Sequence, residues 1–202
     1  RLIWQSPQFD AVDGYPPRLY ASPLYVDEVR IASATHRGAF RVVFAATSNG
    51  FVYAVNAFAN GGTAAGAILW RTRLGMPCKL EPVLLDAAPT GVLATPVIDR
   101  PRRRLYVTSC EPGKRWQAFA LDLANGNVLP GWPVVLDQAT LRSRGVNRNA
   151  ASEGDARDRR FDYTLQRGAL NLSPDGSSLY VTFGDTATGL LVAVDTRTPK
   201  VA

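Results

Sequence analysis

Three stretches of this 202-residue chain repeat one pattern, and the repetition limits the possible folds more than any single motif does. Each stretch holds a run of β-branched and aromatic residues, a short turn, and a second apolar run that ends in Asn or Asp. The three stretches are residues 41–57, 103–123 and 177–196. Two such runs joined by a short turn are typical of a β-hairpin, so the sequence predicts three equivalent hairpins.

A further strand-like run precedes each hairpin, at residues 18–29, 91–101 and 165–176. A run that carries a Trp follows the first two hairpins, at residues 67–74 and 128–136. No segment keeps the 3.6-residue period of an amphipathic helix over its length. The expected unit is therefore four short antiparallel strands, of which the outermost carries the Trp.

Four-stranded units in series are typical of an all-β fold, the β-propeller, in which each unit is one blade. Three blades leave strand edges and apolar faces uncovered, whereas a closed ring needs ~4–8 blades. We therefore expect a partial propeller domain of a six- to eight-bladed ring, with the remaining blades on missing sequence or on another chain. The expected parts are an orphan outer strand and linker at 1–17, a blade at 18–75, a blade at 91–137, a long loop at 138–164, and an incomplete blade at 165–202.

The link between hairpin and Trp resembles the pyrroloquinoline-quinone repeat, whose pattern is roughly Val-Tyr-Ala-x-Asp-x-x-x-Gly-x-x-x-Trp. Here it reads VYAVNAFANGGTAAGAILW over residues 52–70 and AFALDLANGNVLPGW over residues 118–132. The first copy is stretched between its Asn and its Trp, and a further copy, VAVDTRTPKVA over 192–202, has no Trp. The resemblance implies a quinoprotein-like propeller.

In such repeats the Trp of the outer strand docks between adjacent blades, which the resemblance assigns here to Trp4, Trp70 and Trp132. Each indole would cover Ala and Gly positions of the neighbouring blade, and its N–H would donate to a backbone carbonyl. The alternative is an aromatic platform for a ligand. Trp116 begins a middle strand instead, so we expect its removal to destabilise the chain less than removal of Trp70.

Ligand sites of propellers usually lie among the loops near the central channel, which here include the long loop 138–164. Its carboxylates Asp155, Asp158 and Asp162 are candidate calcium ligands, although the loop lacks an EF-hand-like pattern and also fits a solvated, self-paired loop. Gln166 and Arg167 are further candidates to face a ligand, because they resemble a Gln-Arg pair that opens an inner strand in secreted members of the repeat family. We expect Arg167 to face a ligand or to bind backbone carbonyls of an adjacent loop.

Composition excludes several classes of function. Lys and Arg total 23 against 17 Asp and Glu, a formal charge of +6, but the basic residues lack the interleaved aromatics of single-strand nucleic-acid binders. No apolar run approaches the ~18 residues that would predict a membrane span. The single His, His36, and two cysteines do not match a zinc site, and no nucleophile motif is present, so no catalytic residue is assigned.

The repeat places both cysteines at one end of neighbouring sheets. Cys78 falls in the connection from an outer strand to the next inner strand, and Cys110 ends the second strand of the following blade. The repeat family is mostly extracytoplasmic, a setting that permits disulfides. We therefore expect a periplasmic or secreted protein with a Cys78–Cys110 disulfide, and the alternative is two reduced cysteines.

Two functions remain open at this point. The first is a non-catalytic binding or scaffold module without a cofactor, as similar repeats serve in bacterial outer-membrane assembly. The second is a quinoprotein dehydrogenase that uses pyrroloquinoline quinone and calcium. Such enzymes usually show a vicinal Cys-Cys pair and a Glu, Asn and Asp calcium set, and neither pattern is present here. The sequence therefore favours the binding module.

Overall fold

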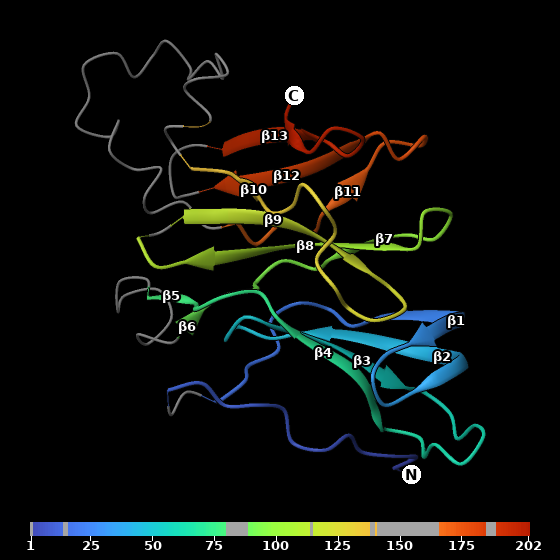
Figure 1. Ribbon diagram of the computed structural model, residues 1–202. Coiled ribbons are helices and arrows are strands. Elements are labelled where there is room, and N and C mark those ends of the chain that lie inside the picture. Colours follow the sequence, from blue (N-terminus) through green and yellow to red (C-terminus); the bar gives the residue numbers. More distant parts are fainter. Residues whose placement is uncertain are drawn as a thin grey trace, which may run out of the picture.

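The computed structural model describes residues 2–13, 16–79, 89–113, 115–137, 140, 166–184 and 189–202. Three four-stranded antiparallel sheets stack face to face, and a two-stranded ribbon is part of the connection from the first sheet to the second (Figure 1). Each sheet is built from four strands that are consecutive in the chain, so the order in sequence is also the order in the stack. The fold is therefore all-β, with the three sheets arranged as blades of a β-propeller.

The first blade has the strand order β1-β2-β3-β4. Side chains on neighbouring positions of a strand point to opposite faces, so the alternating pattern of burial in β1 and β2 indicates one face packed more tightly than the other. The strands are β1 (Leu24–Ala32), β2 (Arg37–Ala46), β3 (Phe51–Asn56) and β4 (Ile68–Arg73).

The second blade repeats this order, and the ribbon precedes it in the chain. All eight residues of β8 pair with β9, which makes this the longest ladder between the middle strands of a blade. The ribbon strands are β5 (Cys78–Lys79) and β6 (Pro89–Thr90), and the blade strands are β7 (Val97–Asp99), β8 (Arg104–Glu111), β9 (Arg115–Asp122) and β10 (Val134–Val135).

The third blade has four strands, although the sequence predicted an incomplete blade. The fourth strand is only two residues long and pairs with the end of the third, at Val194 and Asp195. Its sequence, Lys200–Val201, is too short for a strand pattern to be recognised. The strands are β11 (Asn171–Leu172), β12 (Ser178–Gly184), β13 (Gly189–Asp195) and β14 (Lys200–Val201).

The two middle strands pair in the same register in every blade. An aromatic residue stands opposite an Ala in each of the first, second and third blades, and the pairs are Phe44 with Ala54, Tyr106 with Ala120, and Tyr180 with Ala193. We call the face that carries these pairs the forward face and the opposite one the back face. The forward face of the first blade packs on the back face of the second, and the second packs on the third in the same way.

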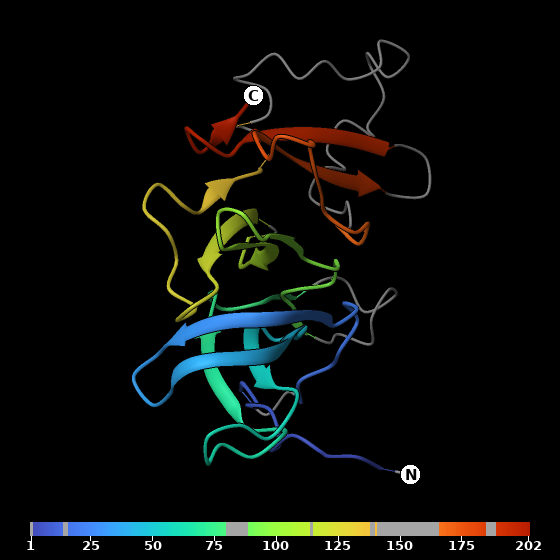
Figure 2. The ribbon, with the colours of Figure 1, turned by 90° about the vertical axis from the view of Figure 1, so that its right-hand side faces the viewer.

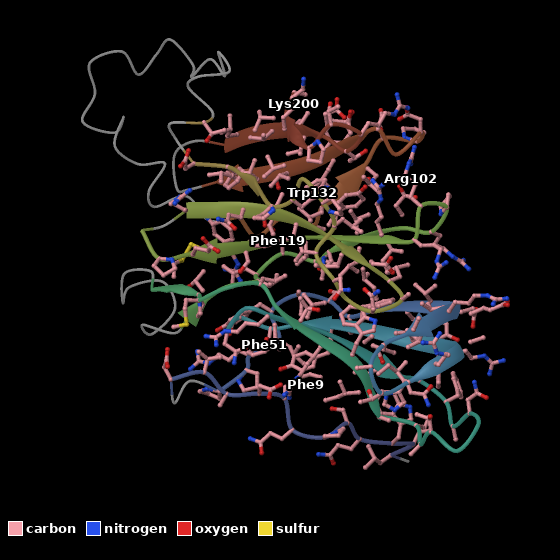
Figure 3. All side chains as sticks on the ribbon, in the orientation of Figure 1. Phe9, Phe51, Arg102, Phe119, Trp132 and Lys200 are labelled. Atoms are coloured by element: carbon pink, nitrogen blue, oxygen red, sulfur yellow. A yellow bond between two sulfur atoms is a disulfide. The ribbon has the colours of Figure 1, made fainter. Side chains whose placement is uncertain are left out.

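Trp70 of the first blade lies on a turn of the second. Trp70 donates its indole N–H to the backbone oxygen of Leu123 at 3.0 Å, and its ring packs beside Phe44 with 5.7 Å between ring centroids. Gly126, with φ +76°, lies under the same indole so closely that a Cβ there would be 2.5 Å from the ring. Trp132 lies in turn beside Tyr106 of its own blade, at 5.4 Å (Figure 3).

The N-terminal segment, residues 2–13, differs from the expected outer strand. Residues 2–11 belong to no strand and instead cross the back face of the first blade (Figure 2). Phe9 stacks on Tyr53 at 4.2 Å, and Asp10 accepts hydrogen bonds from the Tyr53 hydroxyl at 2.9 Å and from Arg71 at 2.6 Å. The segment forms no β-ladder because the face it covers offers side chains rather than a strand edge.

The path of this segment is nevertheless that of an outer strand. A Cβ on Gly66 would lie 3.2 Å from the Trp4 ring, as a Cβ on Gly126 would meet Trp70. Gly66 donates its N–H to the oxygen of Asn56, as Gly126 does to that of Asp122. Trp4 therefore occupies, on the first blade, the place that Trp70 occupies on the second.

Trp116 is more deeply buried than the sequence indicated. It is 1% exposed against 5% for Trp70, and its ring makes an edge contact with Phe183 of the third blade. The expectation that Trp116 contributes less than Trp70 rested on its place in a middle strand. A position in a middle strand does not make Trp116 less buried than Trp70, because the third blade covers the forward face of β9.

The contact of Trp70 with the turn at Gly126 can be tested with two glycine variants. Gly126→Ala and Gly113→Ala both put a side chain at a positive φ, +76° and +82°, and should share a backbone strain of about 1–2 kcal/mol. Only at Gly126 does the methyl group collide with another side chain, because Gly113 has nothing within 4 Å. We expect Gly126→Ala to lose about 1–3 kcal/mol more in urea unfolding. Equal losses would contradict the docking contact.

Candidate functional site

The residues predicted to face a ligand are only partly within the described structure. Asp155, Asp158 and Asp162 lie outside the described residues. Gln166 and Arg167 lie within the described residues and differ in burial: the Gln166 side chain is fully buried, whereas Arg167 is exposed. Two neighbouring residues at the entrance to the third blade therefore have separate roles.

Gln166 joins the second blade to the third. Its side-chain oxygen accepts a short hydrogen bond from the Thr108 hydroxyl, and its nitrogen donates to the backbone oxygens of Gly168 at 2.9 Å and Thr182 at 3.3 Å. Every polar atom of the amide is thus satisfied by protein, as a buried polar group requires. The amide orders the interface between blades and is not presented to a ligand.

The disulfide between Cys78 and Cys110 is confirmed. The two Cα atoms are 5.4 Å apart, and both residues are buried. The bond joins the ribbon strand β5, which follows the first blade, to the end of β8 in the second. It therefore fixes the connection between the first two blades along the edge of the sheets at which the β8–β9 hairpin turns.

The sequence did not predict a polar pair that lies on the back face of the second blade, near the β8–β9 turn. Gln117 donates its side-chain nitrogen to Glu111 at 2.8 Å, while its side-chain oxygen is buried and has no partner among the described residues. A buried amide oxygen without a donor costs about 1–3 kcal/mol. No sequence signal marks the pair, because Glu and Gln at strand ends are ordinary residues.

The forward face of the third blade is exposed and has no neighbouring blade among the described residues. Leu191 is 63% exposed and Tyr180 is 37% exposed. Both stand at positions that are almost completely buried in the first blade, where the equivalent residues are Val52 and Phe44. The residues of this face therefore form a strip of mostly apolar side chains that reaches the surface. The strip comprises Tyr180, Thr182, Leu191 and Ala193.

Hydrogen bonds from neighbouring groups lower the pKa of two carboxyl groups at the turns of the third blade. The hydroxyls of Ser173 and Ser177 donate to the Asp175 carboxylate and hold its pKa well below the usual range. Backbone N–H groups of Thr198 and Arg197 lower the pKa of Asp195 in the same way. On the first blade, burial raises the pKa of Tyr53, so its hydroxyl stays protonated and can donate to Asp10.

Metal and membrane features are limited in the described part of the chain. No three His, Cys, Asp or Glu side chains within the described ranges come together in a way that could hold a metal ion. Within the same ranges, no helix is both long enough and apolar enough to cross a membrane.

Comparison with known proteins gives no family for the chain. No family model and no curated protein matches it. Among solved structures, the chain is similar to a europium-containing methanol dehydrogenase, with 15% identity and a TM-score of 0.47. The match covers 79% of this chain and 29% of that protein, so this chain spans less than a third of its length.

The disulfide gives a direct prediction of stability. The bond closes a loop with a sequence separation of 32, for which the chain-entropy estimate is about 3–4 kcal/mol. The double variant Cys78→Ala/Cys110→Ala should lose about this much in urea unfolding, and wild-type protein unfolded in reductant should match it. Thiol titration of the oxidised protein, denatured without reductant, should find no free thiol. Two free thiols would contradict the bond.

Proposed function

We propose that the chain is a non-catalytic, extracytoplasmic β-propeller module that serves in binding or as a scaffold. The observation that carries the proposal is the uncovered forward face of the third blade, with Leu191 63% exposed. The same positions are covered by a neighbouring blade twice within this chain. A face whose equivalents are interfaces is suited to a protein partner.

The partner that best fits this face is a further blade of the same repeat type. The back faces already in use supply Leu, Val and Phe side chains, such as Leu179, Val181 and Phe183 on the third blade. A partner with similar side chains would bury Leu191 and Tyr180 as Phe44 and Val52 are buried. Such a partner would extend the stack toward a ring of six to eight blades.

The disulfide supports the proposed compartment. Disulfides persist in periplasmic and secreted proteins and are rare in a reducing cytosol. The Cys78–Cys110 bond is buried and links two blades, so it is a structural bond of the kind that exported domains use. This supports a periplasmic or secreted location.

The described residues supply no ligand set for the alternative function, a quinoprotein dehydrogenase, and the candidate calcium ligands Asp155, Asp158 and Asp162 lie outside them. A quinone and calcium site needs a set of oxygen ligands, and no cluster of three acidic, His or Cys side chains exists in the described ranges. The cysteine pair is not vicinal either, because the bonded residues are 32 positions apart. We therefore derive no reaction step through that cofactor.

Two variants at one register position test whether the exposed face is free to bind. Leu191 and Ala118 stand opposite Thr182 and Thr108 respectively, so they are equivalent in the third and second blades. Leu191→Asp should change the free energy of unfolding by no more than about 0.5 kcal/mol, as exposed substitutions do. Ala118→Asp buries a charge between blades and should prevent folding. Comparable losses at both positions would contradict the proposal.

A quinone titration tests the catalytic alternative on the same protein. Pyrroloquinoline quinone with excess Ca²⁺ is added to wild-type protein, and its absorbance and methanol-dependent dye reduction are followed. We expect no saturable absorbance change and no dye reduction above the rate without protein. Saturable binding together with dye reduction would contradict the non-catalytic assignment.

A further inference from the structure

A cleft opens on the first blade, at the end of the stack opposite the uncovered forward face. Its volume is about 630 Å³. Arg41 lies across it, with its guanidinium carbon 5.1 Å from the centre of the exposed Phe58 ring and its Nε 3.8 Å from Asp27. Glu28, in a β-bulge of β1, has a positive φ of 53°. The lining residues are Asp27, Glu28, Ala39, Phe40, Arg41, Phe58, Ala59 and Asn60.

The pairing register shows which positions of the second blade correspond to this cleft. Val42 pairs with Asn56, and Arg104 pairs with Asp122. Arg41 precedes Val42 as Arg103 precedes Arg104, so these two arginines are equivalent. Phe58 lies two residues after Asn56 as Ala124 lies two residues after Asp122, so these two are equivalent as well.

In the second blade, those equivalent positions bind the blade before it. Arg103 donates to the backbone oxygen of Arg30 at 3.3 Å, and the backbone N–H of Ala32 donates to the oxygen of Ala124 at 2.9 Å. Both partners, Arg30 and Ala32, belong to β1 of the first blade. The cleft is therefore the place on the first blade where the inner strand of a preceding blade would dock.

The third blade contacts the second through the equivalent turns. Arg104 of the second blade donates to the backbone oxygen of Thr196 at 3.3 Å, and Arg102 donates to that of Asp175 at 2.8 Å. Thr196 follows Asp195 as Leu123 follows Asp122, so the acceptor is equivalent to the one that binds Trp70. Arginine donors to backbone oxygens thus occur at both interfaces between blades.

The N-terminal segment already supplies one part of such a preceding blade. Trp4 lies against Gly66 as an outer-strand Trp would, and the Asn49 side chain donates to the backbone oxygen of Asp10 at 2.7 Å. The segment covers the outer strands of the first blade, and the cleft beside β1 and β2 is left open. What the first blade lacks is the inner part of a neighbour.

We propose that the missing neighbour is the third blade of a second copy of this chain, which docks its forward face on the cleft and N-terminal segment of the first copy. The chain carries both halves of an interface that it makes twice internally. The forward face of the third blade is exposed, and the cleft of the first blade is open beside the N-terminal segment. They lie at opposite ends of the stack, so one copy cannot bring them together (Figures 1 and 2).

This contact is heterologous, because different surfaces of the two copies meet. Repetition of a heterologous contact closes a ring or extends a chain of copies, whereas an isologous contact stops at a dimer. The proposal rests on the proposed function, since it names the partner of the same exposed face. It predicts that blocking either half in one copy leaves the other half of that copy active.

Sedimentation equilibrium from low to high micromolar concentration tests the proposal. Wild-type protein should exceed the monomer mass of 21.9 kDa as concentration rises. Leu191→Asp on the forward face and Phe58→Asp in the cleft should each weaken association by at least about 30-fold, as loss of an interface hot spot does. Leu19→Asp is the control, because Leu19 is exposed and belongs to neither surface. It should associate as the wild type does.

Mixing the two weakened variants decides between modes of association. An equimolar mixture of Leu191→Asp and Phe58→Asp should form a one-to-one dimer and stop there, because the pair retains one intact interface. Failure of the mixture to dimerise, association of Phe58→Asp at wild-type strength, or a monomeric wild type would each overturn the proposal. None of these results affects the proposed function, which the Leu191 and Ala118 stabilities and the quinone titration test separately.

Discussion

The docking of Trp70 on the turn at Leu123 and Gly126 is the contact on which the stack depends. It satisfies the indole N–H with a backbone oxygen and places the ring on a glycine that leaves room for it. A buried indole contributes a large apolar area only when its N–H has such a partner. The first blade supplies the Trp and the second blade supplies the turn, so this contact joins the two blades directly.

Around this contact, the two faces of each blade have different partners. The forward face presents an aromatic residue opposite Ala, and the back face presents aliphatic side chains such as Leu179 and Val181. Gln166 and the Cys78–Cys110 bond add one polar and one covalent link between blades. The same asymmetry leaves the forward face exposed on the third blade and a cleft open on the first, and the proposed binding function and self-association both follow from it.

The repeat made much of this fold predictable, because β-hairpins and Trp positions leave a periodic pattern. The four-stranded blades and the disulfide followed from that pattern. The burial of Trp116, the two-residue strand β14 and the course of the N-terminal segment did not, because each is decided by what covers a face and not by local pattern. The sequence predicts that Gln166 faces a ligand, yet its side-chain oxygen accepts a hydrogen bond from Thr108, which is distant in the sequence.

Hydrogen exchange of the turn that receives Trp70 tests this account most directly. In wild-type protein the N–H groups of Asp122 and Gly126 are bonded within the turn, to Asn127 and Asp122 respectively. Replacing Trp70 with Leu removes the indole donor and the ring that covers the glycine. The account predicts faster exchange at residues 122–128, with rates in β13 of the third blade unchanged. Unchanged exchange at 122–128, or an equal rise in all three blades, would contradict it.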